Sequence, residues 1–345
     1  MDTLSDCSLP DAQALALLAL HELERGNLDS SRYYSDQAVR HLHAAHVAIG
    51  PEAKNDDAVL CAVRRDVLYA LISLARMIRL GIARVKDATS YAVKRQASTG
   101  TDMINPVGFH VNAQVEQLLS WTEPQPFEFS SASLRTGPAL SQLTTWVYCF
   151  SARAQIYVDD VLPELLLDTY SACLSWYASK LQASKGPAGG SGPFDHMYYH
   201  FCVLELFRPF CDLQCVTMPV SPRQICQESA EAVFAMAKAC RGAKFDDFDL
   251  PCFVPLFLHA AGLIEIDIAE GQARDQGVDM STTTLASQSD PWLWLGDAVD
   301  PLSLGNKAVQ QLTELSSRFE VARKLEAALR TALHNRVGSA EDAAR

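Results

Sequence analysis

The spacing of apolar residues limits this chain to a helical fold more strictly than any other feature of its sequence. After Asn55-Asp56, apolar side chains recur every three or four residues, which places them on one face of a helix: Leu60, Val63, Val67, Leu71, Leu74 and Ile78. The alternation typical of strands nowhere continues for more than a few residues. We therefore predict an all-α fold, a large irregular domain of packed antiparallel helices with no significant sheet.

Breaker residues divide the chain into these helices. A helix over 11–25 is expected to end at Gly26-Asn27, and the next, from about Ser30, at Gly50-Pro51. Loops are expected where Ser, Thr, Gly and Pro are dense, at 86–106 and 122–138. Later helices are predicted at 139–158, from there to about 182, at 194–215, 222–241 and 252–270, and in one piece at 303–335.

The domain organisation follows from these breaks. Residues 1–270 are expected to form the main helical region, either as one unit or as two subdomains joined by a glycine-rich linker at 183–193. A loop is predicted at 271–302, followed by a C-terminal helix and tail at 303–345.

Composition predicts a folded protein of the cell interior. The chain has 345 residues, of which 48% are hydrophobic and 20% charged, so it has the apolar surface to bury a large core. No apolar run approaches the roughly 18 residues of a membrane helix, and the start Met1–Asp6 is acidic where a signal peptide is basic. The formal charge of −12 predicts no direct nucleic-acid binding by this chain, because it repels a phosphate backbone.

The ten cysteines do not form a recognisable framework. No C-x-x-C pair occurs, and most cysteines have apolar neighbours, as Cys149 does between Tyr148 and Phe150. Such residues behave as small hydrophobic side chains in a reducing compartment. Cys211 and Cys215 lie one helical turn apart, but their spacing to the nearest cysteines does not match zinc modules. We expect free buried thiols.

The sequence contains a histidine pair and two acidic pairs that are candidates for metal binding or catalysis. His196 and His200 have the i, i+4 spacing of zinc-binding helices, but the glutamate of H-E-x-x-H is missing and no third ligand is evident. The paired acids at Asp159-Asp160 and Asp246-Asp247 have no partner that would raise the pKa of one of them. The sequence therefore predicts a protein that is not an enzyme and has no cofactor.

Two aromatic clusters have two interpretations. One surrounds Trp146 and the other Tyr198 and Tyr199. Such residues pack the cores of helical domains, and they also line ligand cavities. We assign Trp146, Tyr198, Tyr199, His200 and Arg208 as residues of either an effector cavity or a structural signature.

The segment that carries most of these residues resembles a known family. Residues 194–201 read F-D-H-M-Y-Y-H-F, and 203–210 read V-L-E-L-F-R-P-F. This is similar to the H-M-x-Y-H…L-H-R-P-F helix in the middle homology region of fungal zinc-cluster transcription factors, of the xylanolytic and nitrogen-assimilation activator type. Phe207 replaces the usual His, and Glu205 stands where an apolar residue is common.

Further segments resemble the same family in the same order. Residues 12–40 are similar to its opening hairpin, and 63–85 to a diverged form of its next segment. Residues 221–241 look like the helix after the signature, and 250–262, with L-P-C-F-V-P and H-A-A-G, like its L-P-x-F-V-P…A-G segment.

The resemblance implies a regulatory role. Regions of this type modulate transcription through co-regulators, through a second copy of the protein, or through a small-molecule effector, which implies a nuclear location. The family's DNA-binding zinc cluster, C-x2-C-x6-C, is absent here, so zinc is expected only in a missing N-terminal module. The alternatives are a helical protein-interaction scaffold of the cytoplasm with no direct role in transcription and, with less support, a metal-dependent enzyme that uses His196 and His200.

Arg208 carries one specific structural prediction. It lies in an apolar stretch immediately before Pro209, which removes a backbone donor and interrupts a helix. A buried arginine needs a partner. We therefore expect Arg208 to be paired with an acidic side chain or to cap freed backbone carbonyls.

Overall fold

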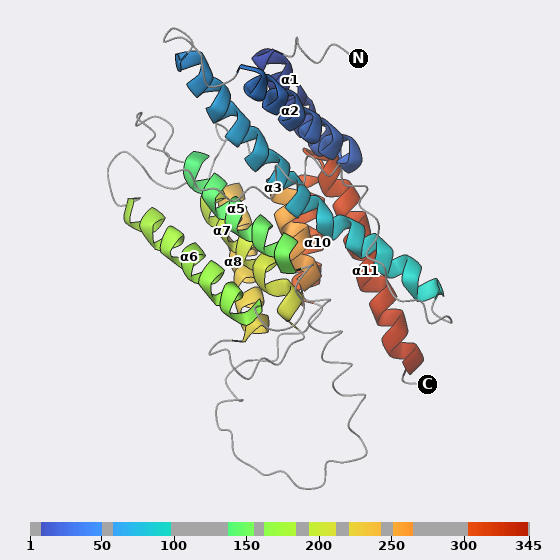
Figure 1. Cartoon of the computed structure of the whole chain (residues 1–345). Coiled ribbons are helices and arrows are strands. Elements are labelled where there is room, and N and C mark those ends of the chain that lie inside the picture. The colour runs from blue at the N-terminus through green and yellow to red at the C-terminus, as the bar shows by residue number, and fades with distance from the viewer. Residues whose placement is uncertain are drawn as a thin grey trace.

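The computed structural model describes residues 8–49, 58–97, 137–154, 162–183, 193–211, 221–242, 251–264 and 303–343. Within these ranges all regular structure is helical and no strand is present. The all-α prediction is therefore confirmed (Figure 1). The predicted loop at 271–302 lies outside the described residues, as does the predicted linker at 183–193 except for its two end residues.

Within the described ranges, the regular structure consists of the following helices. In chain order they are α1 (Leu9–Glu24), α2 (Leu28–Ile49), α3 (Ala58–Ala97), α5 (Gly137–Ala154), α6 (Leu162–Ala183), α7 (Pro193–Phe207), the 3-10 helix η4 (Arg208–Phe210), α8 (Pro222–Gly242), α10 (Ser303–Leu315) and α11 (Glu320–Ala343). Residues 254–264 are also helical.

The α1–α2 hairpin turns where the glycine predicts it. Gly26 has φ of +67°, a left-handed conformation that glycine adopts without strain at helix ends. The Nζ of Lys324, from α11, donates to the carbonyl oxygens of Arg25 and Gly26 at 3.0 and 3.2 Å. A residue near the C-terminal end of the chain thus satisfies carbonyl groups that the end of α1 leaves free.

Helix α3 corrects two predictions. It continues to Ala97, through the start of the loop predicted at 86–106, because no proline or glycine interrupts it between Gly81 and Gly100. Its buried face is also wider than the predicted stripe. Leu71 and Ile78 are buried and Val67 and Leu74 pack against the core as predicted, but Val63 is 43% exposed. Leu68, Ile72, Ala75 and Ile82 are buried as well.

The helix predicted at 303–335 is two helices. A turn at 316–319 separates α10 from α11, and the Oγ of Ser316 donates to the carbonyl oxygen of Thr313 at 2.7 Å. Serine side chains compete for backbone groups in this way and favour helix ends. The turn also brings Phe319 into the core, so the break lets α10 and α11 pack against each other.

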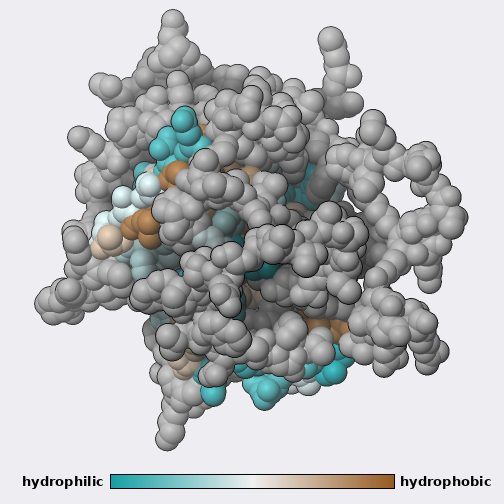
Figure 2. Space-filling model, turned by 90° about the horizontal axis from the view of Figure 1, so that it is seen from below, coloured by the Kyte–Doolittle hydropathy of each residue, from teal (hydrophilic) through white to brown (hydrophobic). Residues whose placement is uncertain are grey.

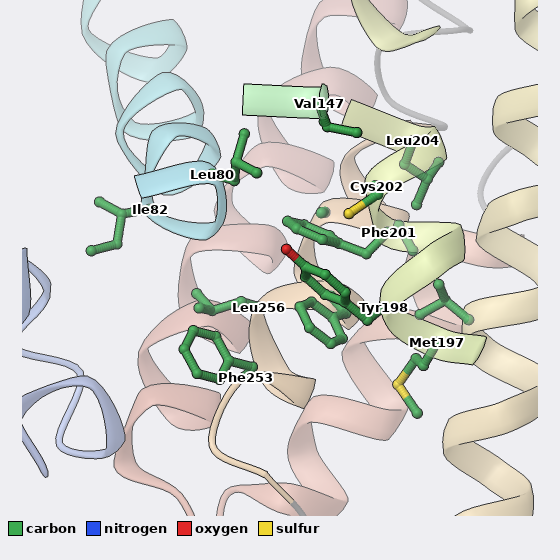
Figure 3. Close-up of a cluster of buried hydrophobic side chains, with 14 of the residues drawn as sticks. Leu80, Ile82, Val147, Met197, Tyr198, Phe201, Cys202, Leu204, Phe253 and Leu256 are labelled. Carbon is green, nitrogen blue, oxygen red and sulfur yellow. The ribbon is translucent and has the colours of Figure 1, made fainter. Parts of the chain in front are cut away.

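Helix α7 and residues 254–264 occupy the centre of the molecule. Every described residue from Phe201 to Phe207 is buried, and so is every residue from Phe253 to Ile264. Helix α7 contacts α5, α6 and α8. Figure 3 shows its side chains beside Leu80 of α3 and beside Phe253 and Leu256. A helix that is buried around its whole circumference in this way occupies a central position.

One hydrophobic cluster joins the whole described structure. Helices α1, α2, α3 and α11 lie together, α5 to α8 lie together, and α10 lies between the two groups (Figure 1). Buried residues on both sides of 183–193 belong to this cluster, which runs from Ala12 to Leu333. None of the helices in the described part of the chain has the length and apolar character that crossing a membrane requires.

Candidate functional site

The residues assigned from sequence gather mainly on α7, which begins with favourable end chemistry. Pro193 occupies the start of the helix and Asp195 its first turn, where a missing donor costs nothing and a negative charge is stabilised. Tyr198, Tyr199, His200 and Arg208 then follow along α7 and η4. Trp146 lies apart in sequence, on α5, half-buried against the same core.

Tyr198 is the centre of a packed aromatic group. Its ring lies 6.1, 6.0 and 5.7 Å from the rings of Phe194, Phe201 and Phe257. Phe201 and Phe257 stack on each other at 4.6 Å. Tyr198 is fully buried, and Figure 3 shows its hydroxyl directed into the core. Because phenylalanine rings occupy this surrounding space, the packing favours the structural role for Tyr198 over the effector cavity.

The Tyr198 hydroxyl has a polar partner. It lies 2.6 Å from the Oγ1 of Thr144, and that hydroxyl donates to the carbonyl oxygen of Leu140 at 2.6 Å. The tyrosine therefore donates to the threonine oxygen. Burial raises the pKa of Tyr198 well above its ordinary value, so the phenol keeps its proton and ties α7 to α5.

This hydrogen bond gives a measurable prediction. Tyr198→Phe removes the hydroxyl and keeps the ring, so we expect a loss of about 1 kcal/mol in the free energy of unfolding, typical of a neutral hydrogen bond. Tyr198→Ala also removes the ring and should cost about 3–5 kcal/mol. Urea unfolding followed by circular dichroism measures both. Equal losses for the two variants would contradict the packing described here.

Tyr199 and the two histidines belong to a second aromatic group at the contact between α6 and α7. The ring of Tyr177 stacks on that of Tyr199 at a centroid distance of 4.1 Å. The ring of Trp176 also stacks on Tyr199, at a centroid distance of 6.3 Å. The Nδ1 of His196 lies 3.1 Å from the Tyr177 hydroxyl, and the ring of His200 lies 5.9 Å from the Tyr177 ring. Sequence reasoning did not single out Trp176 or Tyr177, because only the folded chain brings α6 beside α7.

The histidine pair does not assemble a recognised metal site. Among the described residues, no three His, Cys, Asp or Glu side chains are placed to share one metal ion. The Nδ1 of His200 is buried and has no hydrogen-bond partner among the described residues. Burial, together with the neighbouring His196, lowers the pKa of His200 to about 4. His200 is therefore neutral near pH 7, and its ring makes edge contacts with the rings of Tyr177 and Tyr199.

Arg208 pairs as its sequence position predicts. Its guanidinium lies 3.9 Å from the carboxylate of Glu205, and both side chains are at most 8% exposed. The pair occurs where α7 ends and η4 begins, one residue before Pro209. The prediction that this arginine is paired is confirmed. The helix predicted to continue to 215 changes to a 3-10 turn here, since proline cannot donate to the preceding turn.

His259 lies in the electrostatic field of Arg208. It is 1% exposed, and its Nε2 has no hydrogen-bond partner within the part of the chain that the structure describes. Burial, with a smaller contribution from the charge of Arg208, lowers the pKa of His259 to about 3. In the sequence His259 stands out only as part of the H-A-A-G motif, because a histidine in an apolar helix does not reveal which charge it will face.

His259 makes stability depend on pH in a defined direction. In the unfolded chain a histidine binds its proton below about pH 6.5, whereas folded His259 resists protonation down to about pH 3. The unfolded state thus holds more protons in this window, so stability is complete above about pH 6.5 and falls as the pH is lowered towards 3.

The His259→Leu variant isolates this contribution. We expect its stability between pH 6 and pH 4 to fall less steeply than that of the wild type, by about 1.4 kcal/mol per pH unit. Urea unfolding at a series of pH values gives both slopes. Parallel slopes would show that His259 is not buried in the neutral form.

A group of buried polar contacts, which the sequence did not predict, joins α2, α3 and α5. The Nη2 of Arg79 donates to both carboxylate oxygens of Asp36, at 2.9 and 3.0 Å, and its Nη1 donates to the hydroxyl of Tyr148 at 3.4 Å. Arg76 donates to the Oγ1 of Thr145 at 2.5 Å. Both arginines are buried. Hydrophobic periodicity does not predict a charged residue on the buried face of a helix.

The arrangement is one of packing and buried polar pairs. Tyr198, Tyr199 and Arg208 are held in contacts that join α5, α6, α7 and η4, while Trp146 rests against the same core. Such a constellation fixes helices relative to one another. No protein-family model, no curated protein and no solved structure matches the chain.

Proposed function

We propose that this chain is the regulatory domain of a fungal transcription factor, acting in the nucleus through contacts with co-regulators or with a second copy of itself, and responding to a small-molecule effector. The observation that carries the proposal is the ordered set of motifs between residues 12 and 262. In this proposal DNA is read by a separate zinc-cluster module, which agrees with the net charge of −12.

The segments that carry three of the motifs pack against one another. The signature helix α7 contacts α8, the next motif in the series. Phe257, from the L-P-x-F-V-P-like segment, stacks on Phe201 of the signature. Three segments that resemble one family in order thus meet in one core, as parts of a single signature would.

In this proposal the outer helices α1, α2 and α6 make the contacts with partner molecules. Leu17 and Leu18 of α1 are exposed, and so are Tyr33 of α2 and Leu174 of α6. On the face shown in Figure 2, apolar patches of the described residues are small and lie between polar ones. A regulator that binds partners reversibly needs a surface of this mixed kind.

A reporter assay tests the proposal. The chain is fused to a heterologous DNA-binding domain and expressed in a fungal cell that carries the matching reporter gene. We expect transcription to differ from that given by the DNA-binding domain alone, under at least one nitrogen or carbon source. The same level of transcription in every condition, with the fusion present at normal abundance, would argue against a regulatory domain.

The second candidate is a protein-interaction scaffold with no part in transcription. The α1–α2 hairpin favours it, since Leu17 and Tyr33 are 67% and 56% exposed. Proximity labelling of the tagged chain distinguishes the two. Components of the transcription machinery among the labelled proteins support the regulatory domain, whereas a set confined to the cytoplasm supports the scaffold.

A further inference from the structure

Two cysteine side chains meet at the corner between η4 and α8. Cys211 directly follows η4, and Cys226 lies in the second turn of α8. Their sulfur atoms are 3.5 Å apart. Both residues are buried, Cys211 to 6% and Cys226 to 0% exposure, and neither is part of a disulfide.

The backbone holds both residues in place. The amide of Cys211 donates to the carbonyl oxygen of Arg208 at 3.2 Å, and Cys226 is part of a regular helix whose first turn is closed by the bond from Ile225 to Ser221 at 3.1 Å. Helices α7 and α8 are also in extensive contact. A disulfide has an S–S distance of about 2.05 Å, so the two sulfur atoms have to approach each other by about 1.5 Å to form one.

We propose that Cys211 and Cys226 form a reversible thiol–disulfide pair that closes the η4–α8 corner covalently under oxidation by a hydroperoxide. This inference does not depend on the proposed function. It applies to a segment that the hydrophobic core already fixes, so the new bond adds a cross-link to an existing contact.

The chemistry balances with one equivalent of hydroperoxide. The Cys211 thiolate attacks the terminal peroxide oxygen, the O–O bond breaks, and the alcohol or water that leaves takes a proton, which leaves a sulfenic acid on Cys211. The sulfur of Cys226 then attacks the Cys211 sulfur and displaces the hydroxyl group, which departs as water with the Cys226 proton. A small dithiol reductant reverses the bond by exchange and is itself oxidised to a disulfide.

The surroundings set the order and the pace of these steps. Cys211 is the first sulfur that an oxidant meets, because Cys226 is fully buried. The hydrogen bond between the two thiols and burial raise the pKa of the Cys226 thiol, and the nearby charge of Arg208 acts in the opposite direction. Since the thiolate is the reactive form, we expect this pair to oxidise more slowly than an exposed cysteine.

Peptide mapping of the full chain tests the proposal. The purified protein is treated with hydrogen peroxide, its remaining thiols are alkylated, and it is digested with trypsin without reductant. Cys226 then lies alone on peptide 224–238, while Cys202, Cys211 and Cys215 share one peptide because Arg208 precedes Pro209. We expect these two peptides to be linked after oxidation and separate after treatment with dithiothreitol.

Variants identify the partner on the shared peptide. The link should persist in Cys202→Ala and Cys215→Ala and disappear in Cys211→Ala. An unlinked pair of peptides in the oxidised wild type, or a link that survives in Cys211→Ala, would overturn the proposal. The wild-type map does not depend on whether any variant folds.

A melting experiment measures the effect on the corner. The oxidised wild type should melt several degrees above the reduced protein, because a cross-link restricts the unfolded chain. Cys226→Ala should show no such difference, and Cys240→Ala, a change on the same helix, should behave as the wild type does. An equal oxidation-dependent shift in Cys226→Ala would contradict the assignment.

Discussion

Replacing Gly262 by leucine is expected to unfold the protein or to lower its free energy of unfolding by about 3 kcal/mol or more. A β-carbon at this position would lie 2.6 Å from the Cβ of Ala308 and 2.9 Å from a methyl group of Leu329. The Cβ of Ala308 cannot move without its backbone, so residues 254–264 and α10 would have to separate. Because the residues around Gly262 are buried in the core, such a separation would disrupt the packing of that core.

Gly305 provides the matched control. A β-carbon there would approach a methyl group of Leu333 at 2.8 Å, which is the flexible end of a side chain and can rotate away. Gly262→Ala should therefore cost about 1–3 kcal/mol, whereas Gly305→Ala should cost little, since alanine also favours the helix by about 1 kcal/mol. Chemical unfolding of the two alanine variants gives the comparison. Equal stabilities would show that residues 254–264 and α10 do not approach as closely as described.

The second large effect is expected at the buried ion pair of Glu205 and Arg208. Glu205→Leu leaves a buried guanidinium without this carboxylate, and the loss of one partner of such a pair costs about 3–5 kcal/mol. The double variant Glu205→Leu with Arg208→Met removes both charges. It should recover a large part of the loss, because two apolar side chains replace two desolvated ions.

A thermodynamic cycle over these two positions provides the measurement. The free energies of unfolding of the wild type, the two single variants and the double variant are compared at neutral pH. A double variant less stable than either single variant would mean that the two charges act independently, and the pairing at 3.9 Å would then carry no energy.

Much of the fold could be predicted from the spacing of apolar and breaker residues. The hairpin turn at Gly26 and the interruption at Pro209 are decided by local chemistry, so both appear where the sequence indicates them. The full extent of the buried face of α3 could not be predicted. Leu68, Ile72 and Ala75 are buried because other helices pack on them, and the local spacing does not show this. The continuation of α3 and the break after Leu315 depend on weak local preferences that packing decides.

The candidate site shows the same division. Tyr198, Tyr199 and Arg208 could be selected from one segment because they are close in sequence. Their partners Thr144 and Tyr177 could not, since they come from α5 and α6. The buried arginines of α3 also escaped prediction, because Asp36 of α2 pairs with one of them only in the folded chain.

We propose that this helical core serves transcriptional regulation, and one reporter measurement tests that role most directly. Fusions of a heterologous DNA-binding domain to the wild-type chain, to Gly262→Leu and to Gly305→Ala are compared at equal protein abundance. We predict that the wild type and Gly305→Ala change reporter transcription alike and that Gly262→Leu loses the change. Transcription that is the same for all three fusions and for the DNA-binding domain alone, under every nutrient condition, would contradict the account.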